Sequence, residues 1–478
     1  MRLPTRFLIL CGALGGACGD NPEDPQLVLD AASPTASADA SAAAPRTDGG
    51  APAPDAPAPA SDASGDSAAP PSGSTGDAAT PSARDASSAD DAGDAGPPVS
   101  DDAGKPDTAV IVAAPNGKDD AAGTLAAPTS LKAAIGRVAA GGSIELLGGS
   151  YAFSEQLTIA ATQSGAAGKL KTLRARAGEK PVLDFSAQPY GGSSNPRGLQ
   201  INASYWHVIG LTVKGSADNG IYVAGSNNVV ERCVTHGNRD TGLQIGRASS
   251  SDATIASWPA NNLILNCESY DNYDAPPGSG ENADGFAAKL TVGPGNVFRG
   301  CVAHHNIDDG WDLYTKTDTG PIGSVTIDQC VAHHNGSLTS GMASSNGDRN
   351  GFKLGGEKIA VSHTVTRSVA FANGKNGFTW NSNPGAIRMF NNLAFDNAEG
   401  NFLFGSSSVT TQAVFANNVS FWSSTAADQS DKTMGMEVAG SNAFWDTGKS
   451  PPSVSAKGLS VTAADFASAP GVASVARH

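Results

Sequence analysis

The sequence has few of the features that mark the commonest classes of protein. No apolar run approaches the roughly 20 residues of a membrane-spanning helix. Lys and Arg number 31 against 46 Asp and Glu, and we expect no nucleic-acid partner. Helical periodicity is also rare, because only one segment between residues 108 and 478 has the spacing of an amphipathic helix. A mainly helical fold is therefore excluded, and the many short β-prone runs indicate an all-β domain.

The first 18 residues have the pattern of an export signal. Arg2 and Arg6 precede a short apolar run that leads through small residues to Cys18. Leu14-Gly-Gly-Ala-Cys18 resembles the bacterial lipobox, in which the cysteine is lipidated after cleavage, although Gly15 stands where Leu or Val is usual. Lipidation of Cys18 is favoured over plain secretion with cleavage near Ala17. We therefore expect a bacterial protein that is secreted, or held at the outer membrane or cell surface by a lipidated Cys18.

Residues 19–107 almost lack large apolar side chains and consist mainly of Ala, Pro, Ser, Asp and Gly. Such a segment buries too little apolar surface to offset the entropy of ordering, so we expect a disordered linker. It holds 17 acidic residues against Arg46, Arg84 and Lys105, and its net charge is −14. After this linker and the +2 of the signal are subtracted from −15, residues 108–478 carry only −3. The acidity of the chain therefore describes the linker and says little about the ligands of the folded domain.

The expected folded domain covers residues 108–478. Its one convincing helix lies within 128–140, where Leu131, Ile135 and Val138 share a face before a pair of glycines. A single amphipathic helix ahead of many strands suits a cap, because the first coil of a solenoid must be shielded at its open end. Short β-prone runs separated by Gly, Asn and Asp follow to the end of the domain.

These runs form a repeat in which a short strand ends in Asn and a second strand begins at a glycine. The least interrupted period, from Ser368 to Asn392, is 24 residues long. Short strands at this period, with no helix in each repeat, indicate a right-handed parallel β-helix. The repeats with the clearest glycine are Thr241-Gly-Leu-Gln-Ile, Asp284-Gly-Phe-Ala-Ala, Asp309-Gly-Trp-Asp-Leu, Asn350-Gly-Phe-Lys-Leu and Asn376-Gly-Phe-Thr-Trp.

Alignment of the repeats on this glycine assigns side chains to faces. Residues one and three positions after it are apolar and are predicted to point inward, so the residue between them points outward. Adjacent coils stack about 4.8 Å apart, which places Asp284 beside Asp309 and Lys353 one coil from Asp312. The facing of Asp284 and Asp309 stays open, because alternation cannot be carried across the bend at the glycine. The predicted outward residues are Gln244, Ala287, Asp312, Lys353 and Thr379.

Three further columns of the repeat have structural explanations. The asparagines are predicted to form a ladder of side-chain amides: Asn238, Asn272, Asn306, Asn335, Asn373 and Asn397. The cysteines have no zinc-site spacing and are predicted to pack as thiols, although one or two disulfides are also compatible with the coil spacing and with export: Cys233, Cys267, Cys301 and Cys330. For the histidines, packing at a turn or edge is favoured over catalysis: His304, His305, His333 and His334.

The aspartates of two adjacent coils suggest chemistry. Asp284, Asp308, Asp309 and Asp312 converge there, without a basic partner among them in the sequence pattern. Like charges this close need a cation, and Ca²⁺ fits best because it accepts six to eight oxygen ligands in loose geometry. Lys353 is a lone outward lysine next to this cluster, and a nearby cation lowers the pKa of an ammonium group. It is therefore a candidate base.

The segments that carry these residues resemble the signatures of family 9 polysaccharide lyases, the β-helical pectate lyases. They are Asn282-Ala-Asp-Gly-Phe-Ala-Ala-Lys, Asp308-Asp-Gly-Trp-Asp-Leu-Tyr and Asn350-Gly-Phe-Lys-Leu-Gly-Gly. The resemblance runs from about Val110 to Phe421. It implies a Ca²⁺ cofactor held by the four aspartates, Lys353 as the base, and an acidic polysaccharide such as polygalacturonate as the partner of a monomeric enzyme. On charge and location alone, four basic residues are candidates for binding uronate: Lys289, Lys316, Arg349 and Arg388.

The implied reaction is β-elimination at a 4-linked uronate. Two other classes stay open at this stage. A β-helical glycoside hydrolase would need an acid and a base carboxylate beside the bond, but would leave Lys353 unexplained. A calcium-stabilised adhesin or glycan-binding solenoid would keep the ladder and the aspartates but would also have no use for Lys353.

The charge division of the chain generates a first prediction. A protein that begins at residue 108 is expected to fold and to cleave soluble polymer as fast as the full chain, because residues 1–107 supply only export and a spacer. Circular dichroism and the initial rate on a soluble uronan check this. A truncated protein that is folded but inactive would show that the linker takes part in catalysis.

Overall fold

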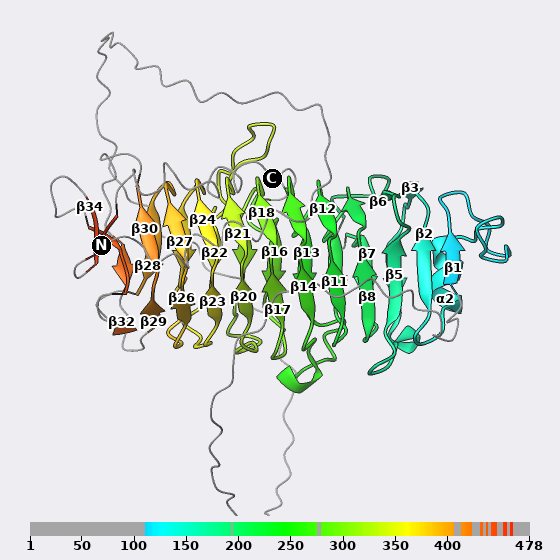
Figure 1. Cartoon of the computed structure of the whole chain (residues 1–478), viewed down its shortest axis with the longest axis horizontal. Helices are drawn as coiled ribbons and strands as arrows, with labels where there is room; N and C mark the ends of the chain where they lie inside the picture. The colour runs from blue at the N-terminus through cyan, green and yellow to red at the C-terminus, as the bar shows by residue number, and fades with distance from the viewer. Residues whose placement is uncertain are drawn as a thin grey trace, which may run out of the picture. The chain divides into compact units, whose positions relative to one another are not determined.

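The computed structural model describes residues 110–192, 195–274, 279–405, 413–422, 431–433, 436–437, 441–446, 453–456 and 459–461 (Figure 1). The predicted export signal, Cys18 and the predicted linker lie outside these residues. Within them, no helix is long and apolar enough to cross a membrane.

The described strands build three long parallel sheets and one small antiparallel sheet. Sheet A comprises β1 (Val110–Ala113), β2 (Ser143–Leu146), β5 (Lys171–Ala175), β8 (Trp206–Ile209), β11 (Val229–Glu231), β14 (Leu263–Leu265), β17 (Val297–Arg299), β20 (Thr326–Asp328), β23 (Thr364–Thr366), β26 (Arg388–Phe390), β29 (Val414–Ala416) and β32 (Met436–Glu437). Sheet B comprises β3 (Gly149–Ala152), β6 (Pro181–Asp184), β9 (Thr212–Lys214), β12 (Val234–His236), β15 (Glu268–Tyr270), β18 (Val302–His304), β21 (Val331–His333), β24 (Val369–Phe371), β27 (Leu393–Phe395) and β30 (Val419–Phe421).

Sheet C is the one on which the predicted site residues lie. It comprises β4 (Leu157–Ile159), β7 (Leu199–Ile201), β10 (Ile221–Val223), β13 (Leu243–Ile245), β16 (Phe286–Ala288), β19 (Trp311–Asp312), β22 (Phe352–Lys353), β25 (Asn376–Thr379), β28 (Gly400–Phe404) and β31 (Lys432–Thr433). The antiparallel sheet comprises β33 (Trp445–Asp446), β34 (Ser453–Ala456) and β35 (Leu459–Val461).

The chain visits sheets A, B and C in turn and then returns to A, so each coil contributes one strand to each sheet (Figure 1). This is a parallel β-helix, as predicted. The register on sheet C is also the predicted one, since Phe286 pairs with Trp311, Trp311 with Phe352, and Phe352 with Phe378. The bend before these strands requires glycine. A Cβ on Gly310 would stand 2.6 Å from the Gly351 carbonyl oxygen of the next coil.

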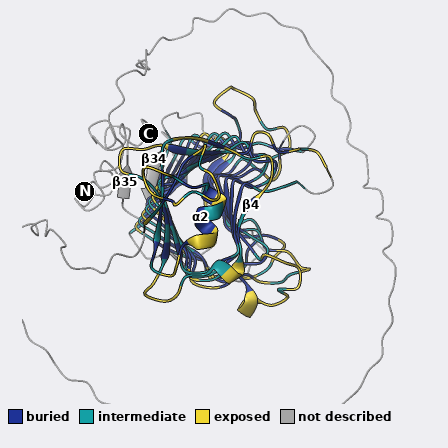
Figure 2. Ribbon diagram, turned by 90° about the vertical axis from the view of Figure 1, so that its right-hand side faces the viewer, coloured by how far each residue is buried: buried dark blue, intermediate teal, exposed yellow. Residues whose placement is uncertain are grey.

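The helix α2 (Leu131–Arg137) lies over the core that the strands enclose, as the view along the stack shows (Figure 2). Ser130 is its N-cap and accepts a hydrogen bond from the Ala133 amide at 3.1 Å, which satisfies one of the unpaired N–H groups of the first turn. Leu131 and Ile135 are buried against the first coils, and Val138 is buried just past the helix end. The predicted cap is confirmed, although the helix is shorter than the 128–140 segment. Two 3₁₀ turns also occur, η1 (Ala161–Gln163) and η2 (Ile255–Ser257).

The inward column of sheet C forms an aromatic stack through the centre of the core. Phe286, Trp311, Phe352, Phe378 and Phe402 lie with successive ring centroids 4.7 to 5.1 Å apart. All five are essentially inaccessible to solvent. Stacked rings at the coil spacing bury large apolar areas and add offset-stacking attraction. This stack therefore packs the coils that carry the predicted site firmly against one another.

The predicted asparagine ladder is present at the turn from sheet B to sheet C. Each side-chain amide donates to the Oδ1 of the next coil at 2.8 to 3.0 Å, from Asn238 to Asn397. The sequence analysis missed a second ladder at the turn from sheet A to sheet B, which includes Asn392, Asn418 and Asn442. Ladders of this kind satisfy buried turn amides that no strand can pair.

The cysteine and histidine columns pack as predicted. The four thiols are buried and free, so the disulfide alternative is wrong for these cysteines. The Cys233 and Cys267 amides donate instead to the sulfur of the next coil, at 3.4 and 3.5 Å. On sheet B, His304 stacks on Tyr270 and His333, with centroids 5.0 and 4.9 Å away. These histidines belong to sheet B and its turns, and none lies on sheet C.

Candidate active site

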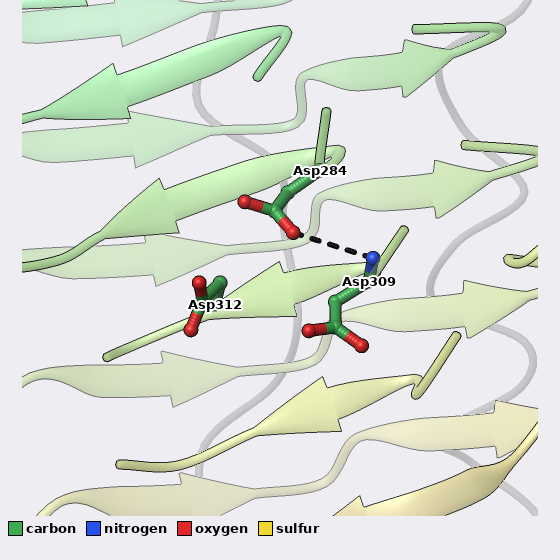
Figure 3. A group of neighbouring side chains, drawn as sticks. All are labelled: Asp284, Asp309 and Asp312. Carbon is green, nitrogen blue, oxygen red and sulfur yellow. Dashed lines mark hydrogen bonds between the residues drawn. The ribbon is translucent and has the colours of Figure 1, made fainter. Parts of the chain in front are cut away.

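Sheet C and the bends that enter it bring three aspartates of two adjacent coils together. Asp284 stands before β16, Asp309 stands before β19, and Asp312 is the outward residue of β19 (Figure 3). One carboxylate oxygen from each lies within 4.8 Å of the others. All three residues are buried. The sequence left the facing of Asp284 and Asp309 open, and the structure shows that both point toward Asp312.

Hydrogen bonds along the bend hold Asp284 and Asp309 in place. Asp309 Oδ1 accepts from the Asn350 amide at 2.6 Å and from Asn350 Nδ2 at 2.9 Å. Asn376 Nδ2 donates in turn to Asn350 Oδ1 at 3.0 Å. On the other side, Asp284 accepts from the Asp309 amide at 3.3 Å (Figure 3) and from Thr241 Oγ1 at 3.0 Å. The bend thus carries its own ladder of hydrogen-bonded polar side chains. Two coils place an aspartate, Asp284 or Asp309, in this ladder, and the next two coils place an asparagine, Asn350 or Asn376.

This ladder leaves carboxylate oxygens turned into the cluster. Asp309 Oδ2 and Asp312 Oδ1 are buried and make no hydrogen bond in the described residues. A buried carboxylate oxygen without a hydrogen bond is costly unless a cation lies near it. The donor set is entirely oxygen, which a hard divalent ion such as Ca²⁺ prefers. The residues present therefore fit the cation that the sequence predicts.

Two lysines supply positive charge to the cluster. Lys289 Nζ lies 2.7 Å from Asp284 Oδ2 and 3.3 Å from Asp312 Oδ2. Lys353 Nζ lies 3.3 Å from Asp309 Oδ2 and 3.7 Å from Asp312 Oδ2. The expectation that the aspartates have no basic partner is wrong. Lys289, predicted to bind uronate, instead reaches back from the end of β16 to pair with the carboxylates.

Burial and crowding shift the ionisation of these groups. Burial and the neighbouring carboxylates raise the pKa of Asp284 and of Asp309 to about 7, although the two lysines act in the opposite direction. Burial would lower the pKa of Lys353, but attraction by the surrounding aspartates outweighs it and raises that pKa above its usual value. The cluster therefore contains several groups with strongly shifted pKa values, as functional sites often do.

Lys353 lies where the register predicts it. It is the outward residue of β22 and pairs across the sheet with Asp312. Its side chain is 9% exposed and Nζ lies 2.9 Å from Asp348 Oδ2. The ammonium also stands over the Tyr314 ring, 5.4 Å from the centroid. Four side chains from two coils thus fix the position of one nitrogen.

Asp308 has a different place from the other predicted metal ligands. It is buried, but its Oδ1 accepts hydrogen bonds from the Asp348 and Arg349 amides. This oxygen therefore fastens the loop that precedes β22, and Asp308 is not in the group of three whose oxygens lie within 4.8 Å. A direct role for Asp308 as a fourth ligand stays a prediction.

The remaining basic candidates are not gathered at the cluster. Arg388 is an exposed residue of β26 on sheet A, away from the strands that carry the aspartates. Lys316 is exposed in the loop after β19, where its carbonyl accepts from Gly320. Arg349 lies beside the cluster, but its side chain packs over Gly336 and Gly374. Their predicted roles in binding uronate stay predictions without a contact that favours them.

The sequence analysis missed Asp348 and Lys375. Asp348 bridges Lys353 and Lys375, with its other oxygen 3.2 Å from Lys375 Nζ. Both residues lie in turns outside the aligned strands, so side-chain alternation could not place them. The signal that could have found Asp348 is its position two residues before Asn350, where one of the three segments that carry the site begins.

The comparisons with known proteins agree with this geometry. The Pel9A-like right-handed β-helix region is the family model that matches, over residues 111–418. Pectate lyase L of Paenibacillus polymyxa (strain SC2) is 54% identical over 325 residues, which cover 68% of this chain and 69% of the relative. Pectate lyase L of Thermoclostridium stercorarium is 45% identical over 326 residues, covering 68% of this chain and 25% of that protein. The crystal structure of pectate lyase Pel9A has a TM-score of 0.62 at 32% identity, covering 76% of this chain and 84% of that one.

The fold and the buried carboxylates define a β-helix protein with a charged site on one sheet. The chain belongs to the Pel9A-like family of right-handed β-helix proteins. The resemblance drawn from the sequence and the predicted right-handed solenoid are both confirmed. The matched residues include the three aspartates, Lys353 and the polar ladder.

The ladder generates a prediction about Asn350. Asn350→Ala removes the side-chain donor that orients Asp309, and it is expected to weaken Ca²⁺ binding about 10- to 100-fold, as loss of an outer-shell partner typically does. Titration calorimetry with Ca²⁺ measures this.

Asn373→Ala is the matched control. It deletes an equally buried amide from the asparagine ladder of the neighbouring turn, without a contact to Asp309. It should lower the thermal midpoint but leave the Ca²⁺ affinity unchanged. Equal Ca²⁺ affinities for wild type and Asn350→Ala would contradict the assigned role.

Proposed function

We propose that this polysaccharide lyase cleaves a 4-linked polyuronate, such as polygalacturonate, by β-elimination, with Ca²⁺ as cofactor and Lys353 as the base. The relatives that cover most of the matched region are named pectate lyases, which supports an acidic polysaccharide as substrate. The observation that carries the finer proposal is the juxtaposition on sheet C of Lys353 with three buried carboxylates, two of which have an oxygen that accepts no hydrogen bond in the described residues.

The chemistry follows from the weak acidity of the proton at C5 of a uronate. A cation bound to Asp284, Asp309 and Asp312 would supply positive charge beside the substrate carboxylate, and so would stabilise the enolate-like transition state. Lys353 Nζ takes the C5 proton, the C4–O4 bond breaks, and a C4–C5 double bond forms. The leaving O4 gains a proton, and no water is added across the bond.

The surroundings of Lys353 suit a base that must be aimed at one atom. Its alkyl chain is buried on β22, and the Tyr314 ring and Asp348 contact its ammonium from sides other than that of Asp309. Such contacts hold a proton acceptor within reach of a bound substrate. They also keep the amine protonated until positive charge enters the cluster, because every carboxylate nearby favours the ammonium form.

Export and anchoring are part of the same proposal. Degradation of a polymer takes place outside the cell, which agrees with an export signal at residues 1–18 and with a lipidated Cys18 at the end of a long spacer. These residues lie outside the described structure, and the support for this part is the sequence pattern alone.

Lys353 is tested by two substitutions. Lys353→Ala is expected to lower kcat by about 10² to 10⁴, the usual cost of losing a positioned general base, while the fold and Ca²⁺ binding are retained. Lys353→Arg should not restore activity, because a guanidinium stays protonated at any workable pH. The readout is the ultraviolet absorbance of the unsaturated product, with Ca²⁺ calorimetry as the control. Near wild-type release of this product by the alanine variant would exclude Lys353 as the base.

The rate should also depend on pH in one direction. Lys353 must be neutral, and Asp284 and Asp309, whose pKa is raised to about 7, must be ionised to hold a cation. Acidification opposes both requirements, so kcat/KM should fall at least about tenfold per pH unit on the acid side, and Ca²⁺ affinity should be lower at pH 6 than at pH 8. A rate that rises on acidification would rule out a lysine base.

A further inference from the structure

Arg239 stands outside the site described above, in the turn between β12 and β13. It follows Asn238 of the asparagine ladder, and Tyr273 follows Asn272 at the same position one coil further on. The Tyr273 amide donates to the Asn238 carbonyl oxygen at 2.8 Å, which fixes this stacking. Tyr190 approaches from the loop between β6 and β7. The guanidinium carbon of Arg239 lies 4.7 Å from the Tyr190 ring centroid and 4.2 Å from that of Tyr273.

Other contacts hold both tyrosine side chains in place. The Tyr190 hydroxyl donates to the Asp274 carbonyl oxygen at 2.6 Å. Tyr273 packs against the small apolar cluster of Ala283, Ile307 and Leu338. The guanidinium carbon therefore lies over two tyrosine rings that are themselves held in place, and such rings attract the cation and limit its movement.

The donors of this guanidinium have no partner among the described residues. In the part of the chain that the structure describes, no hydrogen bond or ion pair involves the Arg239 side chain, which is partly exposed. Arg197 provides the contrast on the same side of the solenoid. It lies 3.5 Å from the Tyr222 ring centroid, but it donates to Asn219 and Gln200 and pairs with Asp218. Arg197 is a structural arginine, whereas Arg239 keeps its planar set of donors for a ligand.

Arg239 lies within two coils of the aspartate cluster. Its turn is the one before the turn that carries Asp284 and two before the turn that carries Asp309, and coils lie about 4.8 Å apart. Direct contacts connect the two places. Asn282 donates through Nδ2 to Asp274 Oδ2 at 3.0 Å, and its carbonyl accepts from Thr241, whose hydroxyl also contacts Asp284. A polymer that lies along sheet C and reacts at the cluster would pass this turn.

We propose that Arg239, held by Tyr190 and Tyr273, binds the carboxylate of a uronate unit next to the one that reacts. This unit would lie over the coils that precede the aspartate cluster in the sequence. The planar guanidinium matches a carboxylate through two parallel N–H···O bonds. The sugar itself can lie along the edges of the flanking rings. This inference rests on the proposed function in taking a polyuronate as the substrate, but it assigns a separate contact that neither the cation cluster nor Lys353 supplies.

The test is Arg239→Gln, which keeps a polar but shorter side chain and removes the charge. KM for polygalacturonate is expected to rise about tenfold, or about 1.4 kcal/mol, with kcat nearly unchanged, because the contact is equally strong in the ground and transition states. Ca²⁺ affinity by calorimetry should equal that of wild type. Arg239→Lys should not restore KM, because an ammonium has no planar pair of donors.

Arg299→Gln is the control, because it removes the charge of an exposed arginine on β17 of sheet A, which has no part in the proposed site. It should leave KM unchanged. Highly methyl-esterified pectin provides a second control, since it lacks the carboxylates, and on any pectin that the enzyme cleaves the two Arg239 variants should differ little from wild type. An unchanged KM for polygalacturonate in Arg239→Gln would overturn the proposal.

Failure of the proposed function is recognised separately. If the wild type releases no unsaturated product from polygalacturonate, the lyase proposal fails, and binding of a galacturonate oligosaccharide is then compared by calorimetry for wild type and Arg239→Gln. Weaker binding by the variant would support Arg239 as a uronate site even so. Equal affinity, or no binding by either protein, would overturn it.

Discussion

The mutual repulsion of three buried carboxylates is the constraint on which the rest of this structure depends. Asp284, Asp309 and Asp312 are each almost inaccessible to solvent, and charges in such a place are expensive unless they are paired. Two lysines pair with them, and hydrogen bonds from the bend hold two of them in place. Even so, buried oxygens of Asp309 and Asp312 accept no hydrogen bond in the described residues. An arrangement this costly supports the proposal of a bound divalent cation.

The β-helix makes this arrangement achievable. Parallel strands of successive coils repeat at a fixed spacing, so residues distant in the sequence fall side by side without long loops. The aromatic stack from Phe286 to Phe402 anchors the coils that carry the site. The same turn that presents Asp284 and Asp309 presents Arg239 in an earlier coil. The proposed contacts with a repeating polymer therefore all lie on one side of the solenoid.

Much of this could be predicted from the sequence. The glycine that recurs at the start of most strands of sheet C fixes the register between coils, and it also fixes which side chains of the strand point inward and which point outward. The adjacency of Asp312 and Lys353 and the inward aromatic column followed from these two rules alone. Register and side-chain alternation predict positions only within the strands. Lys289 lies past β16 and turns back toward Asp284, and Asp348 lies in the loop before β22. The sandwich of Arg239 combines side chains from three turns. No periodicity relates such residues, so only the folded chain shows them together.

The central claim is that this site breaks a uronate bond by elimination and needs a cation to do so. The most direct measurement incubates the protein with a panel of soluble uronans, with Ca²⁺ and with excess chelator, and follows ultraviolet absorbance of the unsaturated sugar end. The account predicts that absorbance rises with polygalacturonate in the presence of Ca²⁺ and does not rise in chelator. Reducing ends released without this absorbance, or a rate that chelator leaves unchanged, would contradict it.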